Sequence, residues 1–419
     1  MRALLLSIIP TLIGGAALAQ AGPGPAETFA EARAICETDG GALWGAPLCT
    51  PVLLVDPATR TVHTARRGDS DALKPEDGLF VGTLPETVNI ANTAVDWDGV
   101  RWAMLIRPLP ENPTERRALL AHEIWHGVQR DLGLPAGSPT PEHLSTTEGR
   151  VLMRLEWRAL AAALRAADPA ARDQAVADAL AFRAARRTLT AQAGDQERQL
   201  EMNEGLAQYT GVRLSGGDAV AEALKGLALA EEQNSFVRNF AYFSGPPYGL
   251  LLDAAAPDWR RGLGAGDDLG ALLAARTGAP AVEAPAAEAR YDGVGIRVDE
   301  AQRAERARAV AAAWTAKLVD GPRLTLAFED MNISFNPSTI VVLGGNGAVY
   351  PTLRVVDSWG VLEVTDGALI DPNWTRVTVA APTSADGREG PGWTLRLNPD
   401  RMLEPGDRPG DFRLRAPRP

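Results

Sequence analysis

A His-Glu-x-x-His sequence runs from His122 to His126, and its spacing suits metal-dependent hydrolysis. On an α-helix, residues i and i+4 lie on one face about a turn apart, so both imidazoles can reach a single metal ion. Glu123 then lies beside the metal, where its carboxylate can take a proton from a water molecule that Zn²⁺ acidifies. The chain has only 4 histidines in 419 residues, so two of them at this spacing favour a zinc site over coincidence.

The residues around the motif predict the helix that it requires. Residues 113–121 begin with proline and continue with good helix formers, and the Leu-Gly-Leu-Pro sequence at 132–135 is a stop signal. Before the helix, residues 100–107 are predicted to form a strand that ends at Pro108. The motif therefore lies on a helix that directly follows a strand.

A catalytic zinc ion usually takes a third ligand from the protein and leaves one position for water. A carboxylate is the better candidate here, because His63 lies in a predicted hairpin and His143 in a proline-rich approach to a helix. Glu148 lies on the next predicted helix, and two consecutive antiparallel helices can easily bring its carboxylate to the histidines. Glu204 lies farther along the chain, after what looks like an inserted pair of helices. The residues alone leave both carboxylates open.

Two further blocks resemble those of gluzincin metallopeptidases, the aminopeptidase-N-like and peptidase-MA-like families. Residues 203–209 read Asn-Glu-Gly-x-x-x-Tyr, and residues 242–245 read Tyr-x-x-Gly. With the histidine motif, they follow the family order over roughly residues 95–255. The resemblance implies that Glu204 is the third zinc ligand and that Tyr242 stabilises the oxyanion of the tetrahedral intermediate. The long gap before the second block departs from the family pattern and keeps Glu148 as the alternative ligand.

The zinc chemistry suggests roles for other groups. Asn203 is expected to orient an imidazole, and Tyr209 and Tyr248 are the substitutes if Tyr242 points elsewhere. The strand at 100–107 is similar to the edge strand along which gluzincins align an extended peptide. No counterpart of the Gly-Ala-Met-Glu-Asn exopeptidase signature is present, so aminopeptidase activity is not implied.

The N-terminal sequence predicts export. Residues 1–19 combine an early arginine, a short apolar run and an Ala-Leu-Ala cleavage site, which is typical of a signal peptide rather than a membrane span. Cys36 and Cys49 are the only cysteines, and in an oxidising compartment they are expected to form a disulfide. The formal charge of −11, without a dense basic run, argues against nucleic-acid binding. We expect a periplasmic or secreted bacterial protein.

The remaining pattern predicts an α+β protein in several parts. After the signal peptide we expect a β-rich segment and then a helical zinc-binding region, which together would form a zincin-like catalytic domain, followed by a small all-β domain. The cluster of Arg183, Arg186 and Arg187 is interpreted as a solvated helix face. The predicted boundaries are 20–110, 111–320 and 321–419.

These observations together predict an exported zinc-dependent metallopeptidase that acts on peptides or proteins. Two alternatives stay open from the sequence. One is a zinc-binding periplasmic scaffold without catalytic activity, and the other is a zinc hydrolase that cleaves a non-peptide ester or amide. The free carboxylate of Glu123 favours a hydrolase over a scaffold, because a structural zinc site gains nothing from it.

Overall fold

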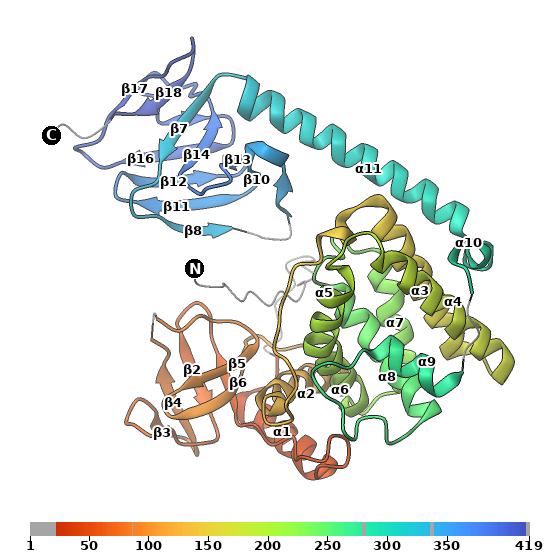
Figure 1. The fold of residues 1–419 in the computed structure, drawn as a ribbon. Coiled ribbons are helices and arrows are strands. Elements are labelled where there is room, and N and C mark those ends of the chain that lie inside the picture. Colours follow the sequence, from red (N-terminus) through yellow and green to blue (C-terminus); the bar gives the residue numbers. More distant parts are fainter. Residues whose placement is uncertain (1–21, 86, 279–281, 336–338, 416–419) are drawn as a thin grey trace. The chain divides into compact units, whose positions relative to one another are not determined.

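The chain folds into two compact units that meet in sequence between Arg297 and Val298 (Figure 1). The predicted signal peptide at 1–19 lies outside the described residues. Among the described residues, no helix is long and apolar enough to cross a membrane. The computed structural model describes residues 22–85, 87–278, 282–335 and 339–415.

The first unit contains a six-stranded sheet with the order β3-β4-β2-β1-β6-β5. The predicted hairpin is confirmed, since β1 pairs antiparallel with β2, whereas β1 pairs parallel with β6. Strand β6 lies between β1 and β5, so the expectation that residues 100–107 form the edge strand is wrong. The edge strand beside it is β5. The strands are β1 (Val52–Val55), β2 (Thr61–Thr64), β3 (Lys74–Glu76), β4 (Leu79–Thr83), β5 (Thr93–Trp97) and β6 (Val100–Ile106).

The two faces of this sheet bury different side chains, because successive residues of a strand point to opposite faces. One face packs on the helices of the unit, and the other closes over a smaller core of its own. Strands β1 and β6 contribute to both cores and are therefore buried on both sides. The helix-facing side chains include Leu54 and Leu105, and the opposite ones include Leu53, Trp102 and Met104.

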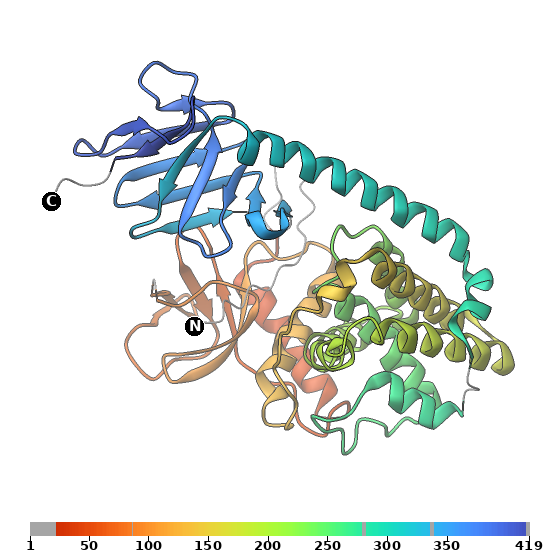
Figure 2. The same ribbon diagram turned by 45° about the horizontal axis from the view of Figure 1, so that its top comes forward.

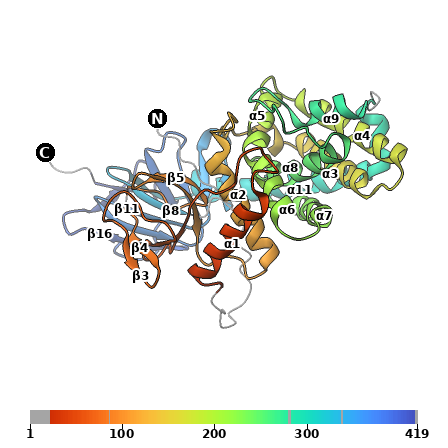
Figure 3. The same ribbon diagram turned by 90° about the horizontal axis from the view of Figure 1, so that it is seen from below.

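A helix precedes the sheet, which the sequence did not predict. Helix α1 (Pro25–Asp39) begins with a proline in its first turn and ends at Gly40, whose φ of 53° is the left-handed conformation that glycine adopts easily. The β-rich expectation for residues 20–110 is wrong over this stretch. Helix α1 lies beside α2 (Pro113–Gln129), the helix with the histidine motif (Figure 3). Glu31 of α1 accepts hydrogen bonds from Arg116 of α2 at 2.6 and 2.8 Å.

The predicted disulfide is present. Cys36 in the last turn of α1 is bonded to Cys49, with 4.9 Å between their Cα atoms. Cys49 lies shortly before β1, so the bond ties α1 to the start of the sheet.

Replacing both cysteines by serine should lower the free energy of unfolding by about 2–4 kcal/mol, because the bond closes a short loop and restricts the unfolded chain. Urea denaturation followed by circular dichroism measures this loss. Wild-type protein held in a reducing agent should show the same shift. An unchanged midpoint in both samples would contradict the assigned role of the bond.

The region after the sheet is mainly helical, as predicted. A short 3₁₀ turn (Glu142–Ser145) precedes α3, and a π-helical turn (Glu201–Gly205) joins α5 to α6 without a break in the helical path. The helices are α2 (Pro113–Gln129), α3 (Thr147–Arg165), α4 (Pro169–Arg187), α5 (Ala193–Leu200), α6 (Leu206–Leu214), α7 (Ala219–Glu231), α8 (Phe240–Ala255), α9 (Leu269–Thr277) and α10 (Ala284–Ala287), followed by a 3₁₀ turn (Glu288–Tyr291).

The arginines of α4 do not form the solvated face that the sequence suggested. Arg183 and Arg186 are only 3% and 0% exposed, and they lie in a network of ion pairs inside the helical region. Their partners come from α3, α5, the π turn and the start of α9. The charge of a buried arginine is tolerated because each guanidinium is paired and hydrogen-bonded.

The second unit confirms the predicted C-terminal β region and also contains most of a long helix, α11 (Gly293–Thr315), which ends in a π turn (Ala316–Asp320). Its strands form a seven-stranded and a five-stranded sheet, and these sheets share one apolar core. Figure 2 shows the strands of this unit together with α11. A hairpin with the glycine-rich sequence Gly-Gly-Asn-Gly at 344–347 joins β9 to β10. The strands are β7 (Arg323–Ala327), β8 (Asn332–Phe335), β9 (Val341–Val342), β10 (Ala348–Tyr350), β11 (Leu353–Asp357), β12 (Gly360–Val364), β13 (Ala368–Ile370), β14 (Arg376–Ala380), β15 (Glu389–Gly390), β16 (Trp393–Leu397), β17 (Leu403–Pro405) and β18 (Phe412–Leu414).

Candidate metal centre

Helix α2 places both motif histidines on one buried face. The helix starts sharply, because the Asn112 side chain accepts hydrogen bonds from the backbone N–H groups of Thr114 and Glu115, and Pro113 occupies the first turn. One turn apart on this helix, the Nε2 atoms of His122 and His126 are 3.2 Å from each other. Both rings therefore present the same nitrogen to one point.

Glu204 completes this cluster from the π turn. Its Oε2 atom lies 3.5 Å from Nε2 of His122 and 3.5 Å from Nε2 of His126. Such spacings fit Zn²⁺, since ligands bound tetrahedrally at about 2.0–2.1 Å are about 3.3–3.4 Å apart. Among the described residues, these are the three whose ligand atoms come together within 4.8 Å as a possible metal site.

The other candidate ligands lie elsewhere. Glu148 is half-exposed at the start of α3 and pairs with Arg297 at 2.8 Å. His143 is buried, and its Nε2 atom lies 2.7 Å from Glu197. His63 lies on β2, opposite Leu54 of β1. The structure therefore brings Glu204 to the histidines and leaves Glu148 in a separate ion pair.

The Nδ1 atom of each histidine is hydrogen-bonded to a glutamine side chain that was not among the predicted site residues. The Nδ1 atom of His122 donates to Gln208 on α6 at 3.0 Å, and that of His126 donates to Gln129 on α2 at 2.9 Å. With a proton on Nδ1, each Nε2 keeps its lone pair for a metal ion. The available signal was spacing, because Gln129 and Gln208 follow His126 and Glu204 by about one helical turn.

Asn203 belongs to the same network but does not contact an imidazole directly. Its Oδ1 atom accepts from Gln129 at 3.1 Å, and its Nδ2 atom donates to Oε1 of Glu204 at 3.2 Å. Asn203 therefore contacts Gln129, which in turn holds the imidazole of His126. Because the amide of Asn203 binds Oε1 of Glu204, the Oε2 atom remains available to the histidines.

The charges in the cluster are arranged for a cation. Burial alone would raise the pKa of Glu204, but hydrogen bonds and the charges of both histidines hold it well below its usual range. Burial likewise lowers the pKa of His126, yet the hydrogen bond and charge of Glu204 outweigh this and raise it to about 9. The negative charge of Glu204 therefore stabilises a proton on His126, and it would stabilise a metal ion at the same place.

Glu123 is positioned as a carboxylate with a free oxygen beside this cluster. The residue is 3% exposed, and among the described residues its buried Oε2 atom has no hydrogen-bond partner. Burial raises the pKa of Glu123 above its ordinary value, although the positive charges of the histidines oppose that shift. A buried carboxylate oxygen without a partner is costly, which is typical of a group kept for function.

Tyr242 on α8 lies directly over the cluster. Its ring is stacked on that of His122, with 5.5 Å between centroids and 2° between planes. Burial and the negative charge of Glu204 raise the pKa of the phenol well above its usual value, so the hydroxyl stays protonated and can donate. The proposed substitutes are engaged elsewhere, since Tyr209 donates to Asp253 and Tyr248 donates to Glu156.

Two glycines bring the helices of Glu204 and Tyr242 together. A Cβ atom added at Gly245 would lie 2.2 Å from the carbonyl oxygen of Gly205, and one added at Gly205 would lie 3.3 Å from Cα of Gly245. The π turn and α8 thus touch backbone to backbone, and no larger residue fits at Gly245 without moving one of them. This contact explains the glycines of both Asn-Glu-Gly and Tyr-x-x-Gly in physical terms.

The geometry thus combines two imidazoles, two carboxylates and a phenol, all drawn from α2, the π turn and α8. Such a set can hold a divalent metal and manage one proton beside it. Comparison with known proteins adds no identity to this geometry, because no family model, curated protein or solved structure matches the chain.

Proposed function

We propose that this protein is a zinc-dependent metallopeptidase with a zincin-like catalytic domain, in which His122, His126 and Glu204 hold Zn²⁺. One observation carries the proposal. The ligand atoms of these residues converge at 3.2 to 3.5 Å beside a buried carboxylate oxygen of Glu123, for which the described part of the chain provides no hydrogen-bond partner. A structural zinc site has no use for such a carboxylate.

The chemistry divides among the side chains. When bound, Zn²⁺ would acidify a water molecule and polarise the carbonyl of the scissile bond. The carboxylate of Glu123 would accept a proton from the attacking water and pass it to the leaving nitrogen. The protonated phenol of Tyr242 donates to the oxygen on which negative charge develops. Gln129 and Gln208 keep the imidazoles in the tautomer and orientation that this work requires.

The edge strand β5 is the element that we propose for peptide binding. Within the described ranges it pairs with β6 on one side only, so its other edge keeps backbone groups that an extended peptide can use. Strand β5 also contacts α2, the helix with the motif. Binding through the backbone would read little side-chain sequence, which suits an enzyme that acts on varied peptides.

We propose a periplasmic or secreted location, because disulfides persist in oxidising compartments. The Cys36–Cys49 bond is consistent with that address. The predicted signal peptide is the second support for it.

Metal analysis and a cleavage assay test the proposed function together. Purified protein should contain about one zinc ion per chain, and it should cleave members of a peptide library in a reaction that a chelator stops and added zinc restores. Mass spectrometry identifies the cleaved bonds. A protein that binds zinc and cleaves esters but no peptides would contradict the peptide assignment, and one without zinc would contradict the metal centre.

The orientation of His122 gives a separate prediction. Replacing Gln208 by alanine should weaken zinc binding by about 10- to 100-fold, since the imidazole loses the acceptor that fixes its tautomer. The dissociation constant follows from competition with a chromophoric chelator. Gln192→Ala is the matched control, because Gln192 is exposed at the start of α5 and makes no side-chain capping bond. Equal zinc affinities in the two variants would exclude this role for Gln208.

A further inference from the structure

The helical segment from α5 through the π turn to α6 contacts two separate groups of residues. Glu197 and Glu201 pair with the arginines of α4. Glu204 and Gln208 face the histidines of α2 instead. The π turn at Glu201–Gly205 lies where the path changes from one group to the other.

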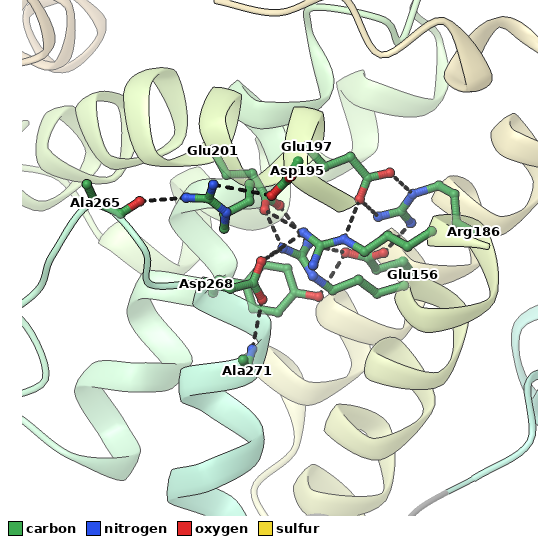
Figure 4. Close-up of polar contacts among 12 residues, drawn as sticks. Glu156, Arg186, Asp195, Glu197, Glu201, Ala265, Asp268 and Ala271 are labelled. Carbon is green, nitrogen blue, oxygen red and sulfur yellow. Dashed lines mark hydrogen bonds and ion pairs between the residues drawn. The ribbon is translucent and has the colours of Figure 1, made fainter. Parts of the chain in front are cut away.

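Glu201, the first residue of the turn, is anchored by a buried ion pair. Its two carboxylate oxygens accept from the two terminal nitrogens of Arg183, and the Nη1–Oε1 distance is 2.7 Å. Arg187 approaches the same carboxylate at 3.5 Å. Arg183 is also held by Asp268, at 3.0 Å, and Figure 4 shows Glu201 and Asp268 in the same polar cluster. A buried bidentate pair of this kind is strong and directional.

The backbone of Glu201 also closes the π turn. Its carbonyl oxygen accepts from the N–H of Leu206, five residues later, where an α-helix would use the residue four later. Glu201 therefore links the ion pair to the turn, because Arg183 holds its side chain and its carbonyl accepts the hydrogen bond that defines the turn.

The π turn has a geometric consequence for the two carboxylates. In a continuous α-helix, residues three apart lie about 60° from each other around the axis. A turn closed between residues i and i+5 holds about 4.4 residues, so the same separation widens to about 115°. Glu201 and Glu204 can therefore point to different sides, one toward Arg183 and the other toward the histidines.

We propose that Arg183 is a positioning residue for the metal centre. By holding Glu201, it fixes the π turn, and the π turn aims Glu204 at His122 and His126. The contact between Gly205 and Gly245 holds the far end of the turn against α8. The ligand carboxylate thus lies on a turn that is fixed at both ends. This inference rests on the proposed function, since it assigns the purpose of the turn to zinc binding.

Arg186 provides a matched control on the same helix. It is as deeply buried as Arg183 and makes a comparable set of ion pairs, but its partners are Glu156 and Glu197 rather than a residue of the π turn. Lysine at either position keeps the positive charge and loses the bidentate geometry. The two substitutions should therefore cost similar stability while differing in their effect on the turn.

The test compares Arg183→Lys with Arg186→Lys in the full chain. Both variants should lose a similar amount of thermal stability without metal. Arg183→Lys should weaken zinc binding by about 10- to 100-fold, measured by competition with a chelator, whereas Arg186→Lys should stay within about threefold of wild type. Glu201→Gln, which keeps the size of the side chain and removes its charge, should weaken zinc binding in the same direction and replaces Arg183→Lys if that protein does not fold.

The outcomes separate the two claims. Equal zinc affinity in wild type, Arg183→Lys and Glu201→Gln overturns the positioning role while leaving the metal centre in place. The same holds if Arg186→Lys weakens binding as much as Arg183→Lys, since the effect would then follow stability alone. Failure of the wild-type protein to bind zinc overturns the proposed function itself, and with it the purpose assigned to the turn.

Discussion

The Glu123→Gln protein should fold, bind zinc and hydrolyse peptides about 10²–10⁴ times more slowly than wild type, the usual range for a lost acid–base group. Glutamine has nearly the same shape and suits a helix, so α2 should keep its structure. The amide cannot accept the proton that the attacking water must lose. Single-turnover cleavage of one peptide substrate, with zinc content measured in the same sample, gives both quantities.

His122→Ala is the control that fails by a different route. It should lose both zinc and activity, because one of the converging nitrogens is gone. If Glu123→Gln cleaved as fast as wild type, the assigned proton transfer would be wrong even for a functioning hydrolase. Loss of zinc from Glu123→Gln would instead make Glu123 a ligand.

After dialysis, the Glu204→Ala protein should contain almost no zinc and should show no activity. Its carboxylate is the part of the cluster that carries negative charge, and it lies 3.5 Å from both imidazole nitrogens. Without it, two histidines remain, which is fewer than the protein ligands of a typical zinc site. Atomic absorption on the dialysed protein measures the metal, and circular dichroism checks the fold.

Glu148→Ala provides the comparison for this experiment. Glu148 pairs with Arg297 at the start of α3, partly exposed to solvent, so its removal should change stability by about 1 kcal/mol or less and leave zinc content as in wild type. The reverse pattern, with zinc lost from Glu148→Ala and kept by Glu204→Ala, would refute the metal centre as drawn.

The histidine motif was predictable because its information is local. The i and i+4 spacing of His122 and His126, the capping residue Asn112 and the proline after it all lie within one helix. The choice between Glu148 and Glu204 was not local, because it depends on which later helix packs against α2. Residue patterns left that choice open, and only the resemblance of the Asn-Glu-Gly block favoured Glu204.

The errors also follow from non-local causes. The arginines of α4 looked solvated because their partners, such as Glu156 and Asp268, come from helices far apart in the sequence. Helix α1 was missed because it buries few large apolar side chains, chiefly Phe29 and Ile35, and is held by a disulfide and the Arg116 ion pair. The position of β6 inside the sheet depends on its pairing with β1, which no pattern within β6 reveals.

The π turn also limits how the length of this segment can change. A π turn holds one residue more than the α turn it replaces, so deleting a residue between Glu201 and Gly205 would leave a regular helix of normal pitch. The flanking helices would hardly notice this change, because five residues at about 82° each and four residues at about 100° each both span slightly more than one full circle. Glu197 would stay with Arg186, and Gln208 would stay with His122. Inside the turn, however, the angle between Glu201 and Glu204 would change from about 115° to about 60° or about 160°, depending on which residue is lost. Loss of one residue would therefore turn the ligand carboxylate away from the histidines while α5 and α6 stay in place.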